Sequence, residues 1–152
     1  MMAEYDISKA IAGDEAAIIG FQMAMAMETE GLALDKERVQ HGVRAVMDDD
    51  SRGVYIVAKE GDTPVASLMV TREWSDWNNR WYWWIQSVYV LPQHRNKGVL
   101  RAMYSYVKEL AREEDVTTVR LYVDRNNHRA QSAYGRLGMA ECHYLMYEDE
   151  IR

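Results

Sequence analysis

Residues 85–110 constrain the fold more than any other part of the chain, because they join a strand to a helix through a short basic turn. Positions 87–91 are rich in β-branched and aromatic residues, and Pro92 ends this run because proline cannot donate to a sheet ladder. Apolar residues then recur at the spacing of one buried helix face, at Leu100, Met103, Val107 and Leu110. The pattern therefore predicts a strand, a turn and a helix in immediate succession.

The turn itself, residues 93–99, is suited to holding an anion. The first N–H groups of a helix have no partner inside it, and the helix dipole favours negative charge at that end. Gly98 lets a ligand approach the backbone closely, while Arg95, Lys97 and Arg101 add positive charge to a chain of formal net charge −6. The alternative is a basic turn whose charges are merely solvated. A P-loop is not indicated, since no G-K-[ST] follows at the required spacing.

Residues 95–100, R-N-K-G-V-L, resemble the Q/R-x-x-G-x-G/A motif of the GNAT acetyltransferases, which hold the diphosphate of acetyl-coenzyme A on this turn. The match has one departure, because Leu100 stands where the family usually has a small residue. The resemblance implies a set of cofactor-binding residues on the turn: Arg95, Asn96, Lys97, Gly98, Val99, Leu100 and Arg101. It also implies that backbone groups at Val88 and Val90 bind the pantetheine arm and the thioester carbonyl, in a gap between two central strands.

A second segment, residues 121–139, is similar to the C-terminal pattern of the same family. The similarity implies that Asn127 hydrogen-bonds the pantetheine arm, that Ala130 leaves room for coenzyme A, and that Tyr134 lies beside the thioester sulfur. Tyr134 is thus the candidate catalytic residue, a general acid that protonates the departing thiolate. The alternative is a packing tyrosine with its hydroxyl at the surface.

Cap and turn signals divide the rest of the chain into further elements. Asp14 and Asp35 are expected to be N-caps, and Gly31 and Gly138 to end helices. The expected elements are strands at 5–10, 54–58, 64–70 and 118–123, helices at 14–31, 35–47 and 127–138, a hairpin turn at 60–63, and one or two strands within 139–147. This order predicts one α/β domain, residues 1–152, with a mixed sheet of six to seven strands and helices on both faces, which is also the order of the GNAT fold.

Length and composition limit the classes of protein that remain. A chain of 152 residues with 48% apolar residues can form one proper core. The net charge of −6 disfavours a nonspecific nucleic-acid binder or an anionic-membrane binder. Cys142 is the only cysteine, which fits a reducing compartment, and we expect it to be a small buried residue rather than a nucleophile. No secretory leader pattern is present, so we expect a cytoplasmic protein. The four histidines show no metal-ligand spacing, and no metal is expected.

Several residues are candidates for the acceptor side of the reaction. An amine has a pKa of about 10.4, so its proton must be removed before transfer. Some family members carry a glutamate at the strand position that Trp84 takes here. Glu28 and Glu30, at the end of the first predicted helix, or Asp76 could act as the base through water. They could instead bind a cationic substrate, or be merely solvated acids.

All five tryptophans lie between positions 74 and 84. Trp83 and Trp84 must point to opposite sheet faces because strand side chains alternate. Trp84 could therefore line an acceptor cleft, where its ring would attract an ammonium group. The alternative for the cluster is sheet core together with a homodimer contact, since aromatic residues are enriched at interfaces.

These observations lead to one functional hypothesis with named alternatives. The resemblance implies an N-acetyltransferase that moves the acetyl group of acetyl-coenzyme A directly to a primary amine of a small molecule. A protein or peptide amino group is the alternative acceptor. A non-catalytic acyl-coenzyme A sensor is the alternative from another class, favoured by the missing strand glutamate, and a nucleotide-binding module is a third.

Overall fold

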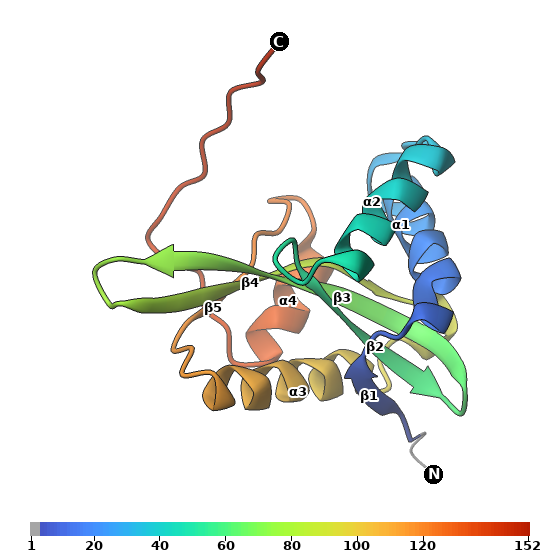
Figure 1. Ribbon diagram of the computed structural model, residues 1–152, viewed down its shortest axis with the longest axis horizontal. Helices are drawn as coiled ribbons and strands as arrows, with labels where there is room; N and C mark the ends of the chain where they lie inside the picture. Colours follow the sequence, from blue (N-terminus) through green and yellow to red (C-terminus); the bar gives the residue numbers. More distant parts are fainter. Residues whose placement is uncertain (1–3) are drawn as a thin grey trace. The chain divides into compact units, whose positions relative to one another are not determined.

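The computed structural model describes residues 4–152. The chain divides into two compact units, Met1–Tyr122 and Val123–Arg152. The first unit holds the sheet and three of the helices, and the second holds one helix followed by an extended C-terminal chain (Figure 1).

The first unit is built on one mixed sheet with the strand order β1-β2-β3-β4-β5. The strands are β1 (Asp6–Lys9), β2 (Val54–Glu60), β3 (Thr63–Ser75), β4 (Arg80–Val90) and β5 (Val119–Arg120). Strands β1 to β4 are antiparallel to their neighbours, and β5 runs parallel to β4. The helices of this unit are α1 (Glu15–Glu30), α2 (Lys36–Asp48) and α3 (Val99–Glu113), with the 3-10 turns η1 (Ala12–Asp14) and η2 (Pro92–His94).

The helices cover both faces of the sheet, as the sequence predicted (Figure 1). Ile56 and Ala58 of β2 pack in the cluster that contains Met103 and the rest of the buried face of α3. Tyr55 and Val57 point the other way and pack with buried residues of α1 and α2. The alternation of strand side chains thus separates two cores, one on each face.

The mixed α/β sheet is confirmed, but it has five strands in the described residues rather than six or seven. The strand expected at 118–123 is only Val119–Arg120, because β5 pairs with β4 at two positions. Residues 139–147 contain no strand. A strand requires a neighbour that takes its N–H and C=O groups, and residue composition shows only that a segment is suited to one.

The two expected N-caps behave differently. Asp35 caps α2 by accepting the N–H groups of Glu37 and Arg38. Asp14 stands before α1, but its carboxylate accepts the N–H of Ile11 and pairs with Lys59 on β2. Asp14 is therefore a link between the start of α1 and the sheet.

Candidate active site

Strand β4 has one edge that is only partly paired. Its parallel ladder with β5 consists of Trp83 with Val119 and Trp84 with Arg120. Beyond Trp84, no strand of the described residues pairs with this edge, while β3 continues along the other edge to Val90. We call this unpaired part, residues 85–90, the open edge of β4.

The open edge presents backbone groups where the sequence predicted the pantetheine site. The N–H of Leu91 donates to the carbonyl of Val65 on the β3 side, at 2.9 Å. Since successive strand residues point their backbone groups to opposite sides, those of Val90, and of Val88 two residues earlier, point away from β3. These groups can bind an extended ligand arm along the edge.

A β-bulge lies in the same half of β4. Ser67 pairs with Tyr89 but Met69 pairs with Gln86, so β4 has one extra residue in this interval. Ser87, within the bulge, has a positive φ of 53°, which few residues other than glycine adopt. Bulges re-aim backbone groups and are over-represented beside active sites.

The predicted turn follows directly after β4. Gly98 takes the N-cap position of α3 with a left-handed φ of 83°, and Asn96 is also left-handed, with a φ of 62°. Asn96, Lys97, Gly98 and Arg101 are exposed, whereas Val99 is buried in the core and Leu100 packs against it. Val99 and Leu100 can therefore offer only backbone groups or a limited surface to a cofactor. The strand, turn and helix succeed one another as predicted.

Arg95 has a more specific position than the sequence suggested. Its Nε donates to the carbonyl of Val90 at 2.8 Å, and its Nη2 lies 2.8 Å from Oε2 of Glu28. Its guanidinium also lies over the ring of Tyr89, at 5.4 Å from the centroid. The side chain thus ties the turn to the end of β4 and to α1, and its contact with a diphosphate remains a prediction.

Of the three candidate carboxylates, Glu28 contacts β4 and the residue Arg95 that follows it. Its Oε1 accepts the Tyr89 hydroxyl at 3.0 Å. Desolvation by burial, followed by the hydrogen bond and the charge of Glu28, raises the pKa of the Tyr89 phenol. Glu30 and Asp76 are exposed, Glu30 at the end of α1 and Asp76 in the β3–β4 turn.

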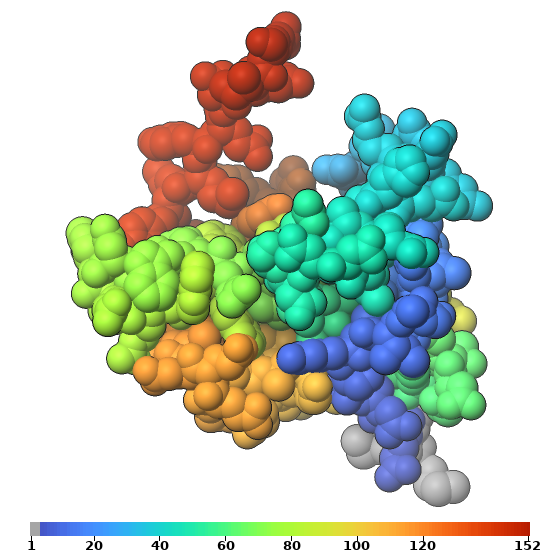
Figure 2. All heavy atoms as spheres, in the orientation of Figure 1, coloured from blue at the N-terminus to red at the C-terminus, as the bar shows by residue number. Residues whose placement is uncertain are grey.

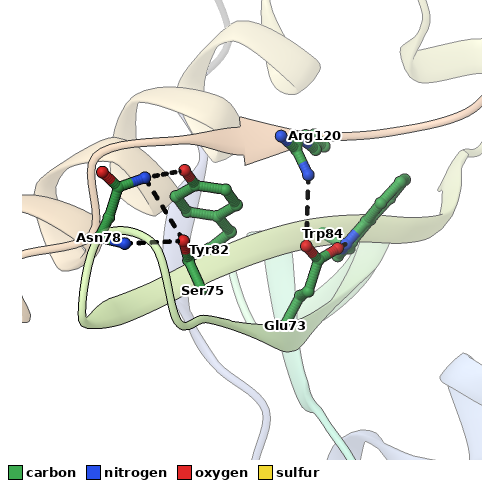
Figure 3. A network of polar contacts seen from close by, with 6 residues as sticks. All are labelled: Glu73, Ser75, Asn78, Tyr82, Trp84 and Arg120. Carbon is green, nitrogen blue, oxygen red and sulfur yellow. Dashed lines mark hydrogen bonds and ion pairs between the residues drawn. The ribbon is translucent and has the colours of Figure 1, made fainter. Parts of the chain in front are cut away.

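A second polar cluster surrounds Trp84, which is half-buried (Figure 3). The Trp84 indole N–H donates to Oε1 of Glu73 at 2.9 Å, and Nη1 of Arg120 lies 3.4 Å from Oε2 of the same carboxylate. The guanidinium of Arg120 lies over the ring of Tyr82, 4.7 Å from its centroid. The Tyr82 hydroxyl in turn contacts the side-chain amide of Asn78. The sequence analysis missed Glu73, because only the strand register places it beside Trp84.

Trp83 and Trp84 point to opposite faces of the sheet, as strand alternation predicted. Trp83 is 5% exposed and belongs to the core under α3, whereas Trp84 points to the opposite face. The core interpretation is wrong for the hairpin tryptophans, because Trp77 is 92% exposed and Trp74 and Trp81 are also exposed. Figure 2 shows the hairpin, in light green, at the surface.

The second unit carries α4 (His128–Arg136) with the other predicted cofactor residues. Asn127 is the N-cap of α4, and its side-chain oxygen accepts the N–H of Ala130 at 3.1 Å. Asn127, Ala130 and Tyr134 follow the i, i+3, i+7 spacing of one helix face. Tyr134 is half-buried, and desolvation raises the pKa of its phenol. Cys142, expected to be buried, is exposed.

The described residues offer neither a metal cluster nor a membrane-spanning helix. Among residues 4–152, no group of three or more His, Cys, Asp or Glu side chains could hold a metal ion. Within the same residues, each helix is too short or too polar to span a bilayer.

These features describe an α/β protein whose sheet opens on one edge, directly before a basic turn at a helix N-terminus. The model of the acetyltransferase (GNAT) family matches residues 22–139, and the chain belongs to this family. The fold is the GNAT fold, and acetyl-coenzyme A is the cosubstrate of the family's acetyltransferases.

Individual relatives agree with this family. The chain is 34% identical over 95 residues to the streptothricin acetyltransferase of Streptomyces lavendulae, a match that covers 62% of this chain and 48% of that protein. The chain thus matches about half the length of this curated relative.

Solved structures extend the similarity to nearly the whole chain. A possible acetyltransferase from Clostridium difficile 630 is 40% identical, with a TM-score of 0.91, and the match covers 97% of this chain and 98% of that one. A predicted acetyltransferase with acetyl-CoA from Clostridium acetobutylicum is 14% identical, with a TM-score of 0.77 and 96% coverage of both chains. At that identity, the second structure supports the fold alone.

Proposed function

We propose that this protein is an N-acetyltransferase that moves the acetyl group of acetyl-coenzyme A directly to a primary amine of a small molecule. The observation that carries the proposal is the succession of the open edge of β4 and the turn at Gly98. One strand thereby offers backbone groups for an extended arm and leads into an exposed basic turn for the diphosphate. Family membership supports acetyl-coenzyme A as the donor.

The residues fit an acetyl-coenzyme A molecule on chemical grounds. Lys97 and Arg101 are exposed cations beside the α3 N-terminus, and a Cβ added to Gly98 would meet open space, so the backbone there is accessible. The backbone groups of Val88 and Val90 would bind the pantetheine arm and the thioester carbonyl along the open edge. A backbone N–H aimed at the developing oxyanion stabilises the transition state more in such a site than in water.

The reaction removes two protons from the acceptor nitrogen and adds one to the departing thiolate. The amine nitrogen attacks the thioester carbonyl carbon, a C–N bond forms and the C–S bond breaks. Tyr134 is proposed to donate a proton to the departing thiolate, and Asn127 and Ala130 on the same helix face are proposed to contact the pantetheine arm. The proton of the acceptor ammonium leaves through water, with Glu28 as the candidate base at the end of β4. The second proton that the nitrogen loses as the amide forms returns through water to the Tyr134 phenolate.

The small-molecule acceptor is proposed from one relative. The name of the Streptomyces lavendulae protein states that it acetylates streptothricin, a small molecule rather than a protein. A peptide amino group and a non-catalytic acyl-coenzyme A sensor are the other outcomes that the experiment must separate.

The first experiment is calorimetric titration of the protein with acetyl-coenzyme A. In the Gly98→Asp variant, a carboxylate faces the diphosphate, and two unit charges 4 Å apart interact by about 4 kcal/mol at an effective dielectric constant of about 20. We expect at least about tenfold weaker binding. Gly61→Asp is the matched control, because Gly61 has a similar left-handed φ of 62° but lies in the β2–β3 turn.

Turnover is measured next, as release of free coenzyme A thiol in the presence of streptothricin, n-butylamine or a lysine-containing peptide. Turnover of a small amine supports the proposal, turnover of the peptide alone supports the other acceptor class, and binding without turnover supports the sensor. If both aspartate variants bind acetyl-coenzyme A as tightly as the unmodified protein, or if both lose affinity equally, the cofactor binds elsewhere.

A further inference from the structure

Glu73 lies on the sheet face that carries α1 and α2. Met69 packs with Tyr55 and Val57 on that face, and Glu73 follows Met69 by four strand residues, so its side chain points to the same side. The turn at Gly98 leads into α3, which covers the opposite face. A donor bound along the open edge from the α3 side would therefore meet an acceptor that arrives from the Glu73 side.

The carboxylate of Glu73 lies where the open edge begins. Trp84 and Arg120, which both contact it, form the last residue pair of the β4–β5 ladder. The next residue of β4, Ile85, belongs to the open edge. The two contacts thus hold a negative charge at the point where the two strands stop pairing (Figure 3).

Glu73 is fixed in place but still accessible. One oxygen accepts the Trp84 indole N–H, and the other contacts Arg120. An ionised carboxylate has about four acceptor positions, so about two remain. The Glu73 side chain is 44% exposed, which allows a ligand to reach them.

Aromatic rings surround this carboxylate. Trp84 and Tyr122 have ring centroids 6.4 Å apart, and the Trp84 ring is half-buried. The Tyr82 ring face is already covered by the Arg120 guanidinium. An ammonium group that binds Glu73 would therefore lie near the side chain of Trp84, whose indole N–H holds the same carboxylate.

Glu28 is less suited to this role. Both of its carboxylate oxygens are engaged, one by the Tyr89 hydroxyl and the other by Arg95. An ammonium group would have to compete with Arg95 for this carboxylate. Glu73 pairs with Arg120 at the longer distance of 3.4 Å, and its side chain is 44% exposed.

We propose that Glu73 is the acceptor-binding residue, whose carboxylate accepts hydrogen bonds from the ammonium group of an alkylamine while the Trp84 indole N–H and Arg120 hold the carboxylate in position. The inference rests on the proposed transfer to an amine. Glu73 then determines the affinity for the acceptor, and Trp84 is a positioning residue that acts through Glu73.

A binding experiment tests the site without catalysis. The indole N–H resonances of the five tryptophans are recorded by NMR, and that of Trp84 is identified by its absence from Trp84→Phe. We expect titration with n-butylamine or streptothricin to move the Trp84 resonance saturably, and n-butanol to leave it unchanged. The shift should disappear in Glu73→Gln and persist in Asp62→Asn, a control for removal of an exposed charge in the β2–β3 turn. An unmoved resonance, or the same shift in Glu73→Gln, would overturn the proposal.

Kinetics provide the second readout. A hydrogen bond to a charged group has an effect of about ten- to a hundredfold, so Glu73→Gln should raise the KM of the amine by that factor. The affinity for acetyl-coenzyme A, measured by calorimetry, should stay within about twofold. Glu73→Asp should recover part of the amine KM, because it keeps the charge. An amine KM in Glu73→Gln within about twofold of the unmodified protein would exclude Glu73 as the acceptor-binding residue.

The two proposals fail in different ways. If no amine is acetylated but the Trp84 resonance still responds to amines through Glu73, the proposed function fails and the ammonium site stands. If amines are acetylated and neither the resonance nor the KM depends on Glu73, the function stands and the ammonium site is wrong.

Discussion

The contact between Asp14 and Lys59 allows a quantitative test of what holds α1 to the sheet. Asp14 is 3% exposed. Its Oδ2 accepts the N–H of Ile11 at 2.9 Å, and its Oδ1 lies 2.9 Å from the Lys59 ammonium nitrogen, on a lysine side chain that is 19% exposed. The Asp14→Ala substitution removes both contacts and leaves a lysine charge and a backbone donor without their acceptor.

The expected loss follows from burial. Removing one partner of a buried pair destabilises a protein by about 3–5 kcal/mol. Lys59 can extend its stem toward water, so we expect the lower end, about 3 kcal/mol. For a chain of this length, that corresponds to a fall in Tm of about 6–12 °C.

The adjacent residue provides a matched control. Glu15 pairs with Arg44 at 2.8 Å, but the Arg44 side chain is 63% exposed. Both Asp14 and Glu15 are acids at the start of α1, so either alanine variant loses a similar interaction with the helix dipole. Glu15→Ala should cost only about 0–1 kcal/mol, as exposed pairs do.

The measurement is urea unfolding at pH 7, with the free energy taken by linear extrapolation and the m-values compared to check two-state behaviour. Adding Lys59→Met to Asp14→Ala should recover part of the loss, because the double variant no longer has an uncompensated charge. Equal losses in Asp14→Ala and Glu15→Ala would refute the reasoning that burial, and not proximity to α1, sets the energy of the pair.

Two further predictions concern a buried hydroxyl and the candidate acid. Ser67 is fully buried, and its Oγ has no hydrogen-bond partner in the structure, so Ser67→Ala should raise the free energy of unfolding by about 1 kcal/mol in urea titration; a loss of that size would show that the hydroxyl is satisfied. Tyr134→Phe should lower kcat by about 10²- to 10⁴-fold with acetyl-coenzyme A binding retained, and a change of less than about threefold would remove Tyr134 from the mechanism. Because burial raises the pKa of Tyr134, its phenol stays protonated beyond its usual value of about 10, so kcat should show no alkaline loss of this acid below about pH 10.

Local sequence patterns correctly predicted the strand and the helix on either side of the basic turn at residues 93–99. The strand, the turn with Gly98 and the helix face through Met103 are all properties of residues close in sequence. Their propensities and spacing are therefore visible without a structure. The helices on both faces and the opposite orientation of Trp83 and Trp84 followed from the order of the elements and from strand alternation.

Strand pairing was predicted less well. β5 has only two residues, and residues 139–147 contain no strand, although their composition suited one. The exposure of Trp77 and Cys142 was likewise missed. Pairing and burial depend on which neighbour a segment meets, and residue type alone does not specify that neighbour.

The family motifs, the basic turn at residues 93–99 and the order of strands and helices follow from the sequence alone, because each depends on residues close together in the chain. Only the tertiary structure decided that Arg95 binds Glu28, 67 residues away, and that Trp84 holds Glu73, 11 residues away across a hairpin. A shift of one residue in the β3–β4 register would turn Glu73 to the other face and away from Trp84. The turn at residues 93–99 is therefore specified by local sequence. The candidate acceptor site depends instead on strand register, which is determined by the pairing and packing of the whole sheet.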